Sequence, residues 1–523
     1  MRRRVSATAT PWVLDSRPTH AFALSLSTLL LAGSMMQTLI ESARAADWII
    51  TPSIAARQGF TDNARHATRG NEKADAFTSL TPAISISGLG PRVSLNVSYA
   101  LTGIHYYDDD ELDKISHNLL GGGTAELIDE LLYLDARAAI FQQLLDPTST
   151  QSGQDAPIIG QETNDSSNTT TAKTYSLSPY LRNRFGSFAD SELRYRFNQF
   201  ISGAGESTSN TISETLSSGA DFTRLRWLAQ AIAVDTKGSN NGASSSTNAI
   251  TGGPARDSSR QMASFSPEYV VSRYLSLLGS VGYERIEDET LADEPNGIIG
   301  NAGVRVNPGP RSTFRVLWNH RYEENYFTGD GAYLIGPTTR LDFAYTRDVQ
   351  TSQSAYEESL SYLGTDEYGN FIDTRSLQGF RLDNYGTGFS NSAYRQERYS
   401  LRLTSSLDRD SLSAEVYRQT RESTNALSTQ TTNGVTLGWS RPLSPLLGFR
   451  FGMSYTDTEF DSITVEGGGT REDQSVRGGP GLNYAISETM SGSLNYNFIY
   501  RFSNAPDSNQ RENIITVGVR KIF

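Results

Sequence analysis

The C-terminal stretch Asn513-Ile-Ile-Thr-Val-Gly-Val-Arg-Lys-Ile-Phe523 decides the fold. Ile515, Val517 and Val519 recur at every second position before the terminal aromatic residue. Side chains of a β-strand alternate between the two faces of the sheet, so one face of this segment is apolar. A chain that ends on such a strand, with an aromatic residue last, is typical of the closing strand of an outer-membrane barrel.

Three residues of this segment, Val517, Val519 and Phe523, are the expected signal for the barrel-assembly machinery. Lys521 departs from the pattern, because an aromatic or aliphatic side chain is usual at the third position from the end. A lysine near the membrane surface extends its amine into the headgroup region, so this residue weakens the signal without removing it.

The composition favours strands over helices. The chain has 523 residues, of which 20% are charged, and it holds 25 tyrosines and 22 phenylalanines against 6 methionines. The absence of cysteine excludes disulfides and thiolate metal sites. A mean hydropathy of -0.43 agrees with a transmembrane barrel, in which alternate residues face the interior rather than lipid.

Residues 1–45 are predicted to be a secretory signal peptide. Residues 2–4 are all arginine, an uncharged stretch runs from Thr19 to Ile40, and Ala43-Arg44-Ala45 places small residues at the two cleavage-site positions. The alternative is an uncleaved inner-membrane anchor, because the uncharged stretch is long enough to span a bilayer.

Cleavage after Ala45 removes five arginines and two acidic residues, so the formal net charge changes from -12 to -15. Such acidity argues against nucleic acid as a partner. No apolar stretch long enough for a helical span follows Ile40, so a mature chain that enters a membrane must do so as strands. We therefore expect residues 46–523 to form one all-β domain in the bacterial outer membrane, surrounded by its lipid and lipopolysaccharide.

Segments of alternating polarity recur along the mature chain. The clearest is Ser493–Phe502, in which five large apolar side chains alternate with polar ones. Similar segments are Leu95–Leu101, Leu193–Asn198, Leu341–Tyr345, Tyr399–Thr404 and Phe449–Tyr455.

Two kinds of connection take turns between these segments. The short ones, rich in Gly, Pro, Asp and Ser, are Gly88–Arg92, Ile128–Glu130, Gly186–Phe188, Ser272–Tyr274, Asn307–Arg311, Asp408–Asp410, Ser444–Leu446 and Ser487–Thr489. The long polar ones are Asp146–Asn168, Thr236–Ser259, Thr365–Ser392 and Thr456–Arg471. Alternation of this kind predicts a barrel with short periplasmic turns and long extracellular loops.

Counting the segments predicts about 22 strands, with the weakest turn near Asp348–Ser352. The fold class that follows is a single transmembrane antiparallel up-and-down β-barrel. A soluble propeller would also alternate, but it would repeat a blade motif, and the sequence contains none.

If the apolar face meets lipid, a set of arginines points into the lumen. These candidates are Arg137, Arg194, Arg196, Arg315, Arg402, Arg450, Arg501 and Arg520. One interpretation is that they pair with inward acids such as Asp135 and Asp342 and fill the barrel. The other is a positive track for an anionic solute or polymer.

No plug domain is expected, because Trp48–Ile54 already reads as a strand directly after the predicted cleavage site. An open barrel of this size would be a very wide hole. The loops Asp146–Asn168, Thr236–Ser259 and Thr365–Ser392 are therefore candidates for folding into the lumen.

Signals for catalysis are poor. His105 and His117 flank an acidic run that includes Asp108 and Asp109, and these four side chains are a weak candidate for a divalent-cation site. The alternative is a solvated acidic loop beside cations bound by lipopolysaccharide. A surface hydrolase that uses one of these histidines is a third reading. We expect no enzyme activity and no cofactor.

Three stretches carry a family resemblance: Asp47-Trp-Ile-Ile-Thr-Pro-Ser-Ile-Ala-Ala-Arg-Gln-Gly-Phe-Thr-Asp-Asn63, Tyr333-Leu-Ile-Gly-Pro-Thr-Thr-Arg340 and Tyr362-Leu-Gly-Thr-Asp-Glu-Tyr-Gly-Asn-Phe-Ile-Asp373. With them the chain resembles the PEP-CTERM (exosortase) system-associated outer-membrane protein family over nearly all of the mature sequence. The resemblance implies a Gram-negative bacterium with an exosortase-type sorting system and an exopolysaccharide locus. It implies no active-site residues.

Two functions follow as expectations. The first is a porin-like channel linked to export of exopolysaccharide or of PEP-CTERM surface proteins, with anionic polysaccharide or export proteins as partners. The second is a structural or docking barrel with a closed lumen, whose outer loops bind polysaccharide or a partner.

Overall fold

The computed structural model describes residues 47–144, 169–203, 205–240, 257–288, 296–351, 363–365, 371–373, 393–423, 429–464, 469–506 and 508–523. These residues form 24 strands and one short 3-10 helix, η1 (Asp110–Leu112). No helix in this part of the chain is long and apolar enough to cross a membrane.

The strands are β1 Asp47–Thr61, β2 Asp75–Leu89, β3 Val93–Tyr106, β4 Lys114–Ile128, β5 Leu132–Leu144, β6 Thr169–Phe185, β7 Ala189–Ser202, β8 Gly205–Ser218, β9 Leu225–Asn240, β10 Ser258–Ser272, β11 Leu275–Asp288, β12 Asn296–Gly309, β13 Ser312–Arg321, β14 Glu324–Ile335, β15 Thr339–Thr351, β16 Leu363–Thr365, β17 Phe371–Asp373, β18 Ala393–Leu407, β19 Asp410–Ser423, β20 Thr429–Pro442, β21 Leu447–Thr464, β22 Thr470–Ser487, β23 Met490–Ser503 and β24 Gln510–Ile522.

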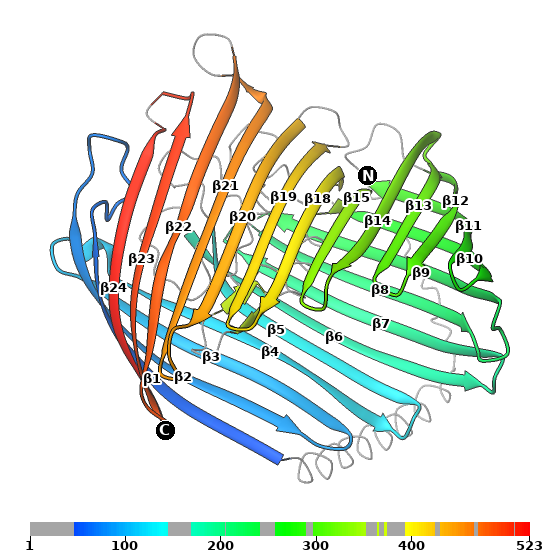
Figure 1. The fold of residues 1–523 in the computed structure, drawn as a ribbon, viewed down its shortest axis with the longest axis horizontal. Helices are drawn as coiled ribbons and strands as arrows, with labels where there is room; N and C mark the ends of the chain where they lie inside the picture. Colours follow the sequence, from blue (N-terminus) through cyan, green and yellow to red (C-terminus); the bar gives the residue numbers. More distant parts are fainter. Residues whose placement is uncertain are drawn as a thin grey trace, which may run out of the picture.

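Twenty-two of these strands close into one antiparallel ring (Figure 1). Each strand of the ring pairs with its neighbours in sequence, and β1 pairs with β24 from Ser53↔Ile522 to Thr61↔Ile514. The strand number agrees with the count predicted from the connections. β16 and β17 belong to the long chain segment that connects β15 to β18, and they pair with each other in a separate two-stranded sheet.

One end of the ring carries the tight turns. Every short connection predicted from the sequence joins two strands there, and the turns 219–224 and 336–338 add to them. At the other end the loops are not uniformly long. β13 and β14 are joined by Tyr322 and Glu323 alone, whose φ values of 52° and 62° are left-handed, as in the turns that match the twist of a hairpin.

Two sequence predictions about connections were wrong. The described residues Asp348–Thr351 form no turn, because β15 continues to Thr351 and pairs with β18. The polar stretch Thr456–Arg471 is mostly strand, since β21 runs to Thr464 and β22 starts at Thr470. Backbone pairing needs no apolar side chains, so strands that continue beyond the lipid lose their alternating pattern and read as loops.

The two faces of the ring differ as the alternation predicted. The outward face carries exposed apolar side chains, for example Leu193, Tyr195 and Ile212. The inward face of the same region carries buried polar side chains, for example Ser178 and Asn198. The ring has no layered apolar core, and its inward side chains are the candidates for function.

Candidate functional site: the charged inner wall

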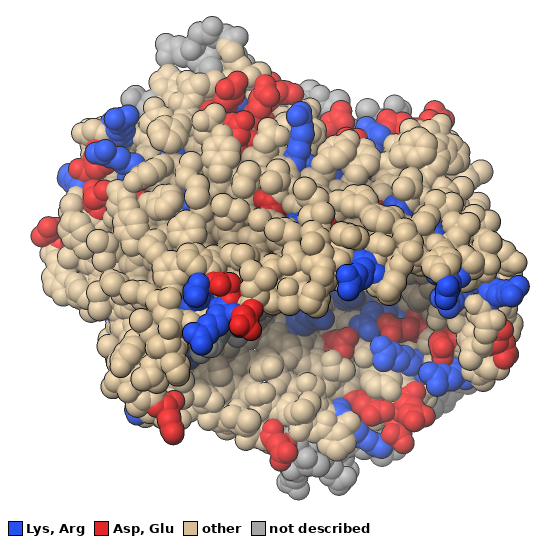
Figure 2. Space-filling model, in the orientation of Figure 1, with Lys and Arg blue, Asp and Glu red and all other residues tan. Residues whose placement is uncertain are grey.

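The eight predicted arginines occupy strand positions whose neighbours along the chain point outward, so their side chains lie on the inner wall. Figure 2 shows a hollow on the side facing the viewer, where Lys and Arg lie among Asp and Glu. The inner wall is therefore charged with both signs. Which arginines are neutralised by a neighbouring acid decides what the wall can attract.

Arg194 of β7 is held in a closed cluster. Its Nη1 donates to Asp135 Oδ2 at 2.7 Å and its Nε to Glu192 Oε1 at 2.9 Å. Its guanidinium lies 3.8 Å from the centre of the Tyr180 ring, which stacks at 5.1 Å on Tyr133. Both the charge and the planar face of Arg194 are thus occupied, and this arginine has a structural part.

Four other predicted arginines also contact inward polar groups. Arg315 pairs with Asp330 at 2.6 Å, Arg402 with Glu415 at 2.9 Å, and Arg501 with Asp473 at 3.3 Å, while Arg450 donates to Asn495 Oδ1 at 3.1 Å. Arg520, the last of the set along the chain, donates to Ser53 Oγ at 3.3 Å across the β1–β24 seam. These contacts join neighbouring strands along the wall.

Arg137 and Arg196 differ from the rest, since neither forms a hydrogen bond or an ion pair with a side chain in the described part of the chain. Arg137 on β5 is exposed and Arg196 on β7 is half-buried. Arg137 pairs with Ser176, and Ser176 pairs with Asn198, which is two residues from Arg196. The two arginines therefore lie two strand spacings apart and are offset by two residues along the strand direction. With strands spaced about 4.8 Å apart, their Cα atoms lie roughly 12 Å from each other, so both guanidinium groups can reach one anion.

The charge on this part of the wall can be followed pair by pair. The inward acids of β5–β7 are Asp135, Asp190 and Glu192, and each accepts from an arginine: Arg194, Arg184 and Arg182, respectively. Arg137 and Arg196 are left over. A locally positive patch therefore lies inside a chain whose formal net charge is -12.

A second inward cluster was not predicted from the sequence. Glu284 of β11 has no exposed surface and accepts from Arg260 at 2.7 Å, from Arg321 at 2.8 Å and from the Tyr322 hydroxyl at 2.7 Å. Its donors come from β10, the end of β13 and the β13–β14 turn. The alternation of Tyr283, Glu284 and Arg285 was the signal that could have shown Glu284 to point inward, but no sequence spacing identifies its three donors.

The loop between β1 and β2, residues 62–74, lies against the inner wall. Ala64 packs with Phe77, Ile104 and Tyr106, which are buried inward residues of β2 and β3. The side chain of His66 lies 3.1 Å from Glu512 Oε2 on β24. The three loops predicted to fold inward lie largely outside the described residues, so this shorter loop is the one seen to cover the wall.

The weak candidate for a cation site is not brought together. His105 Nδ1 contacts Asp113 at 2.7 Å, His117 Nδ1 contacts the Tyr99 hydroxyl at 2.8 Å, and the Asp109 carboxylate accepts from Arg65. The Asp108 carboxylate contacts neither histidine, and the described residues hold no group of three metal-binding side chains. The hydrogen bond from Arg65 lowers the pKa of Asp109 below its usual value, so this carboxylate stays charged as part of an exposed ion pair.

Comparisons with known proteins agree with the fold. Residues 349–523 match a family model described as the outer membrane protein beta-barrel domain. A search of curated protein sequences finds no match. Among solved structures, the FrpB iron transporter from Neisseria meningitidis superposes with a TM-score of 0.52 at 10% identity, covering 90% of this chain and 82% of that chain.

Two further solved structures superpose similarly. The siderophore receptor PirA from Acinetobacter baumannii has a TM-score of 0.50 at 7% identity and covers 91% of this chain and 80% of that chain. FpvA from P. aeruginosa has a TM-score of 0.50 at 11% identity and covers 91% and 72%, respectively. At such identities the likeness concerns the fold. Together with the family model, it defines the chain as an outer-membrane β-barrel.

The comparisons also correct the predicted fold class. We expected a barrel without a plug domain, but the solved structures that superpose on this chain are plugged receptors. The chain itself forms a closed 22-stranded antiparallel barrel, and no plug stands as a separate domain within the described residues. The prediction was wrong because the position of the first strand, Trp48–Ile54, does not determine which class of barrel the strands form.

Proposed function

We propose that the protein is a non-enzymatic outer-membrane channel whose inner wall guides an anionic solute or polymer. The observation that carries this proposal is the pair Arg137 and Arg196, which have no ion pair in the described part of the chain although the neighbouring inward acids are all matched. In a confined lumen, a fixed positive patch raises the local concentration of anions and lowers the barrier to their passage.

The expected context is export of exopolysaccharide or of PEP-CTERM surface proteins from a Gram-negative cell. This part of the proposal rests on the family resemblance of Asp47–Asn63, Tyr333–Arg340 and Tyr362–Asp373. Acidic polysaccharides carry carboxylates at regular spacing, which suits two guanidinium groups borne on Cα atoms roughly 12 Å apart. An iron–siderophore ligand is not proposed, since about 10% identity to such transporters extends to the fold alone.

The experiment is single-channel recording in planar bilayers with the purified full-length protein. We expect conductance with a preference for anions, and a lower preference in Arg137→Gln and Arg196→Gln. Arg285→Gln is the matched control, because it removes the same charge from the outward face of β11. Equal selectivity in all four proteins would contradict the role of the inner-wall pair, and a protein that never conducts would contradict the channel itself.

A second function, a docking barrel with a closed lumen, is favoured by a different observation. Phe77, Tyr106 and Phe141 point inward and yet are almost completely buried, so the inner wall is covered at those positions. Binding of secreted polysaccharide to cells or proteoliposomes, without conductance, is the result expected of this function. We propose no enzyme activity, and His105→Ala with His117→Ala is expected to leave polysaccharide secretion unchanged.

A further inference from the structure

The contact between β14 and β15 loses its backbone pairing in the half nearer the long loops. The register of the two strands ends at Gly329↔Tyr345. Beyond that row, residues 324–328 of β14 pair only with β13, and residues 346–351 of β15 pair only with β18, within the described part of the chain. These two edges, the split seam, face each other without a ladder of hydrogen bonds.

Ion pairs cross the split seam where the backbone does not. Arg347 of β15 pairs with Glu324 of β14, and Arg395 reaches the same carboxylate from β18 at 3.4 Å. Arg321 of β13 reaches Asp348 of β15 at 2.8 Å. The side chains of Glu324 and Asp348 are 44% and 52% exposed. Ion pairs exposed to this extent hold two strands together only weakly, so the edges can separate without breaking backbone hydrogen bonds.

The inner side of the split seam is open to the lumen. Thr346 and Asp348 share the inward face of β15 with Asp342, because side chains two residues apart on a strand lie on the same face. Both Thr346 and Asp348 are exposed. The lumen therefore reaches the two unpaired edges.

The outer side of the split seam lies at the boundary of the apolar band. Phe327 pairs with Trp318 on the outward face, and these side chains are 62% and 43% exposed. The next outward row, Asn325 and His320, is polar. Such a change from aromatic to polar residues is typical of the membrane interface. The split seam thus begins where the acyl chains of the outer leaflet meet the headgroups.

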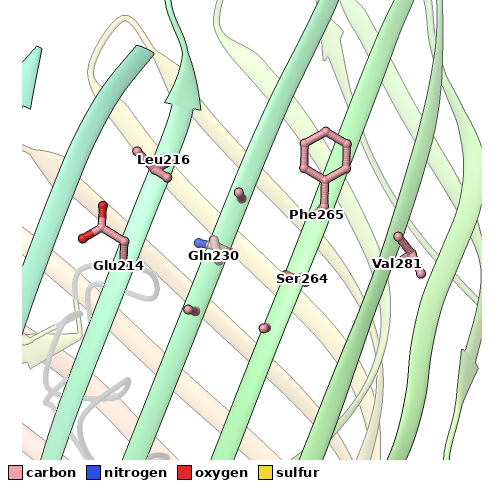
Figure 3. Close-up of a pocket in the computed structure, with 9 residues that line it drawn as sticks. Glu214, Leu216, Gln230, Ser264, Phe265 and Val281 are labelled. Atoms are coloured by element: carbon pink, nitrogen blue, oxygen red, sulfur yellow. The ribbon is translucent and has the colours of Figure 1, made fainter. Parts of the chain in front are cut away.

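The wall is closed at two other places that resemble an opening. The β4–β5 pairing also ends early, at Leu119↔Ile140, but the inward residues beyond it, Asn118 and Phe141, are buried, so the lumen does not reach those edges. A shallow groove of about 380 Å³ lies on the outward face of β8–β11 (Figure 3), but the strands beneath it pair with one another. At the split seam, in contrast, an unpaired backbone coincides with an exposed inner side.

The chemistry of the split seam indicates what it can pass. An open sheet edge does not persist in hydrocarbon, so water from the lumen or a polar ligand must satisfy its free backbone groups. A wholly polar solute gains nothing by leaving the lumen sideways, because lipid does not solvate it. The guanidinium groups of Arg321, Arg347 and Arg395 are suited to phosphate or carboxylate, which they bind through parallel hydrogen bonds. A molecule with acyl chains and an anionic headgroup meets all of these conditions.

We propose that the split seam is a lateral opening in the wall, through which an amphiphile with an anionic headgroup passes between the lumen and the outer leaflet. The headgroup replaces Glu324 and Asp348 as the partner of the three arginines, while the acyl chains lie beside Phe327 on the outward face. Without a ligand, the ion pairs of Glu324 keep the edges together. This route is separate from the axial path past Arg137 and Arg196 and does not depend on it.

The absence of cysteine allows a single cysteine to report on the opening. Thr346→Cys places it on the inner side of the split seam. Thr432→Cys is the matched control, because it changes the same residue type in the same register row, three strands away, between fully paired neighbours. The full-length protein in phosphatidylcholine vesicles is exposed to a phospholipid that carries maleimide on its headgroup. Each labelling rate is divided by the rate with a water-soluble maleimide.

We expect the normalised rate to be at least tenfold higher at position 346 than at position 432. Equal normalised rates would overturn the opening. A diacylglycerol that carries maleimide but no phosphate is expected to label Thr346→Cys severalfold more slowly than the phospholipid does. Equal rates with the two lipids would overturn the anionic ligand.

A second pair of variants tests the ion pairs that keep the split seam closed. Glu324→Gln in the Thr346→Cys protein is expected to raise the rate of labelling by the phospholipid severalfold. Glu397→Gln is the control, because Glu397 pairs with the same Arg347 at 3.1 Å but across the fully paired β15–β18 contact, and the rate is expected to stay unchanged. The shift of the folded barrel on unheated gels verifies folding of every variant. A folded Glu324→Gln barrel that is labelled no faster than its parent would overturn the closing role of these ion pairs.

Discussion

Glu284 offers the sharpest test of how the inner wall is held together. The carboxylate has no exposed surface and accepts from three donors on three separate elements: Arg260, Arg321 and Tyr322. Glu284→Gln keeps the shape of the side chain and removes its charge. The Arg321 side chain, 13% exposed, then keeps only Asp348 at 2.8 Å as an acidic partner.

The magnitude follows from burial. Breaking a buried ion pair by removing one partner costs about 3–5 kcal/mol. Arg260 is 38% exposed on its side chain and can turn toward water, which reduces the loss. We therefore expect Glu284→Gln to lower the free energy of unfolding by about 3 kcal/mol, roughly a hundredfold change in the folded-to-unfolded ratio.

The assay is reversible urea unfolding of the purified barrel in lipid vesicles, followed by tryptophan fluorescence. The control is Asp342→Asn, which removes one charge from a more exposed inward pair with Arg340, whose side chains are 57% and 34% exposed. Exposed pairs contribute about 0–1 kcal/mol, so the control is expected to unfold close to the native protein. The reasoning is refuted if the two variants lose the same free energy, because burial would then not decide the strength of these contacts.

Three further predictions concern other parts of the barrel. The hydrogen bond from Arg65 holds the pKa of Asp109 below its usual value, so the ion pair stabilises the outer loops at neutral pH and is lost as the pH falls through that lowered pKa. The hydrogen-exchange protection factor of residues 62–74, which corrects for the pH dependence of the chemical exchange rate, is expected to fall on acidification, and Arg65→Gln is expected to show the low protection factor at neutral pH as well. The backbone N–H of Phe523 donates to Pro52 O at 3.0 Å, and its side chain is 72% exposed. Deletion of Phe523 is expected to slow assembly in cells severalfold, as measured by pulse-chase labelling. A terminal tryptophan in its place is expected to restore the level of folded protein. Arg194→Lys cannot contact Asp135 and Glu192 with a planar fork, so it is expected to cost about 1–2 kcal/mol in the same urea assay, whereas a value near zero would show that the cluster is not rigid.

The strand positions were largely predictable because lipid imposes a local rule. Residues such as Leu494, Val517 and Leu193 must be apolar at every second position, and this period is visible in the sequence without any knowledge of pairing. The rule ends where lipid ends. β15 beyond Asp348 and β21 beyond Thr456 were therefore misread as a turn and a loop, although their backbones pair as strands.

The inward direction of the arginines followed from the same alternation, but their partners did not. Arg194 meets Asp135 across two strand spacings, 59 residues away in sequence, whereas Arg196 next to it meets no acid in the described residues. Only the register of β5, β6 and β7 distinguishes the two.

By itself, the sequence determined that the chain forms a ring of about 22 strands, with lipid outside and polar side chains inside, because alternation along one strand is a local property. The tertiary structure decided which charges are neutralised, which loop covers the wall at Ala64, and where the outward face is grooved. Those properties depend on the pairing of side chains from strands far apart in sequence, and the hydrogen-bond register that brings them together is set by the closure of the whole barrel.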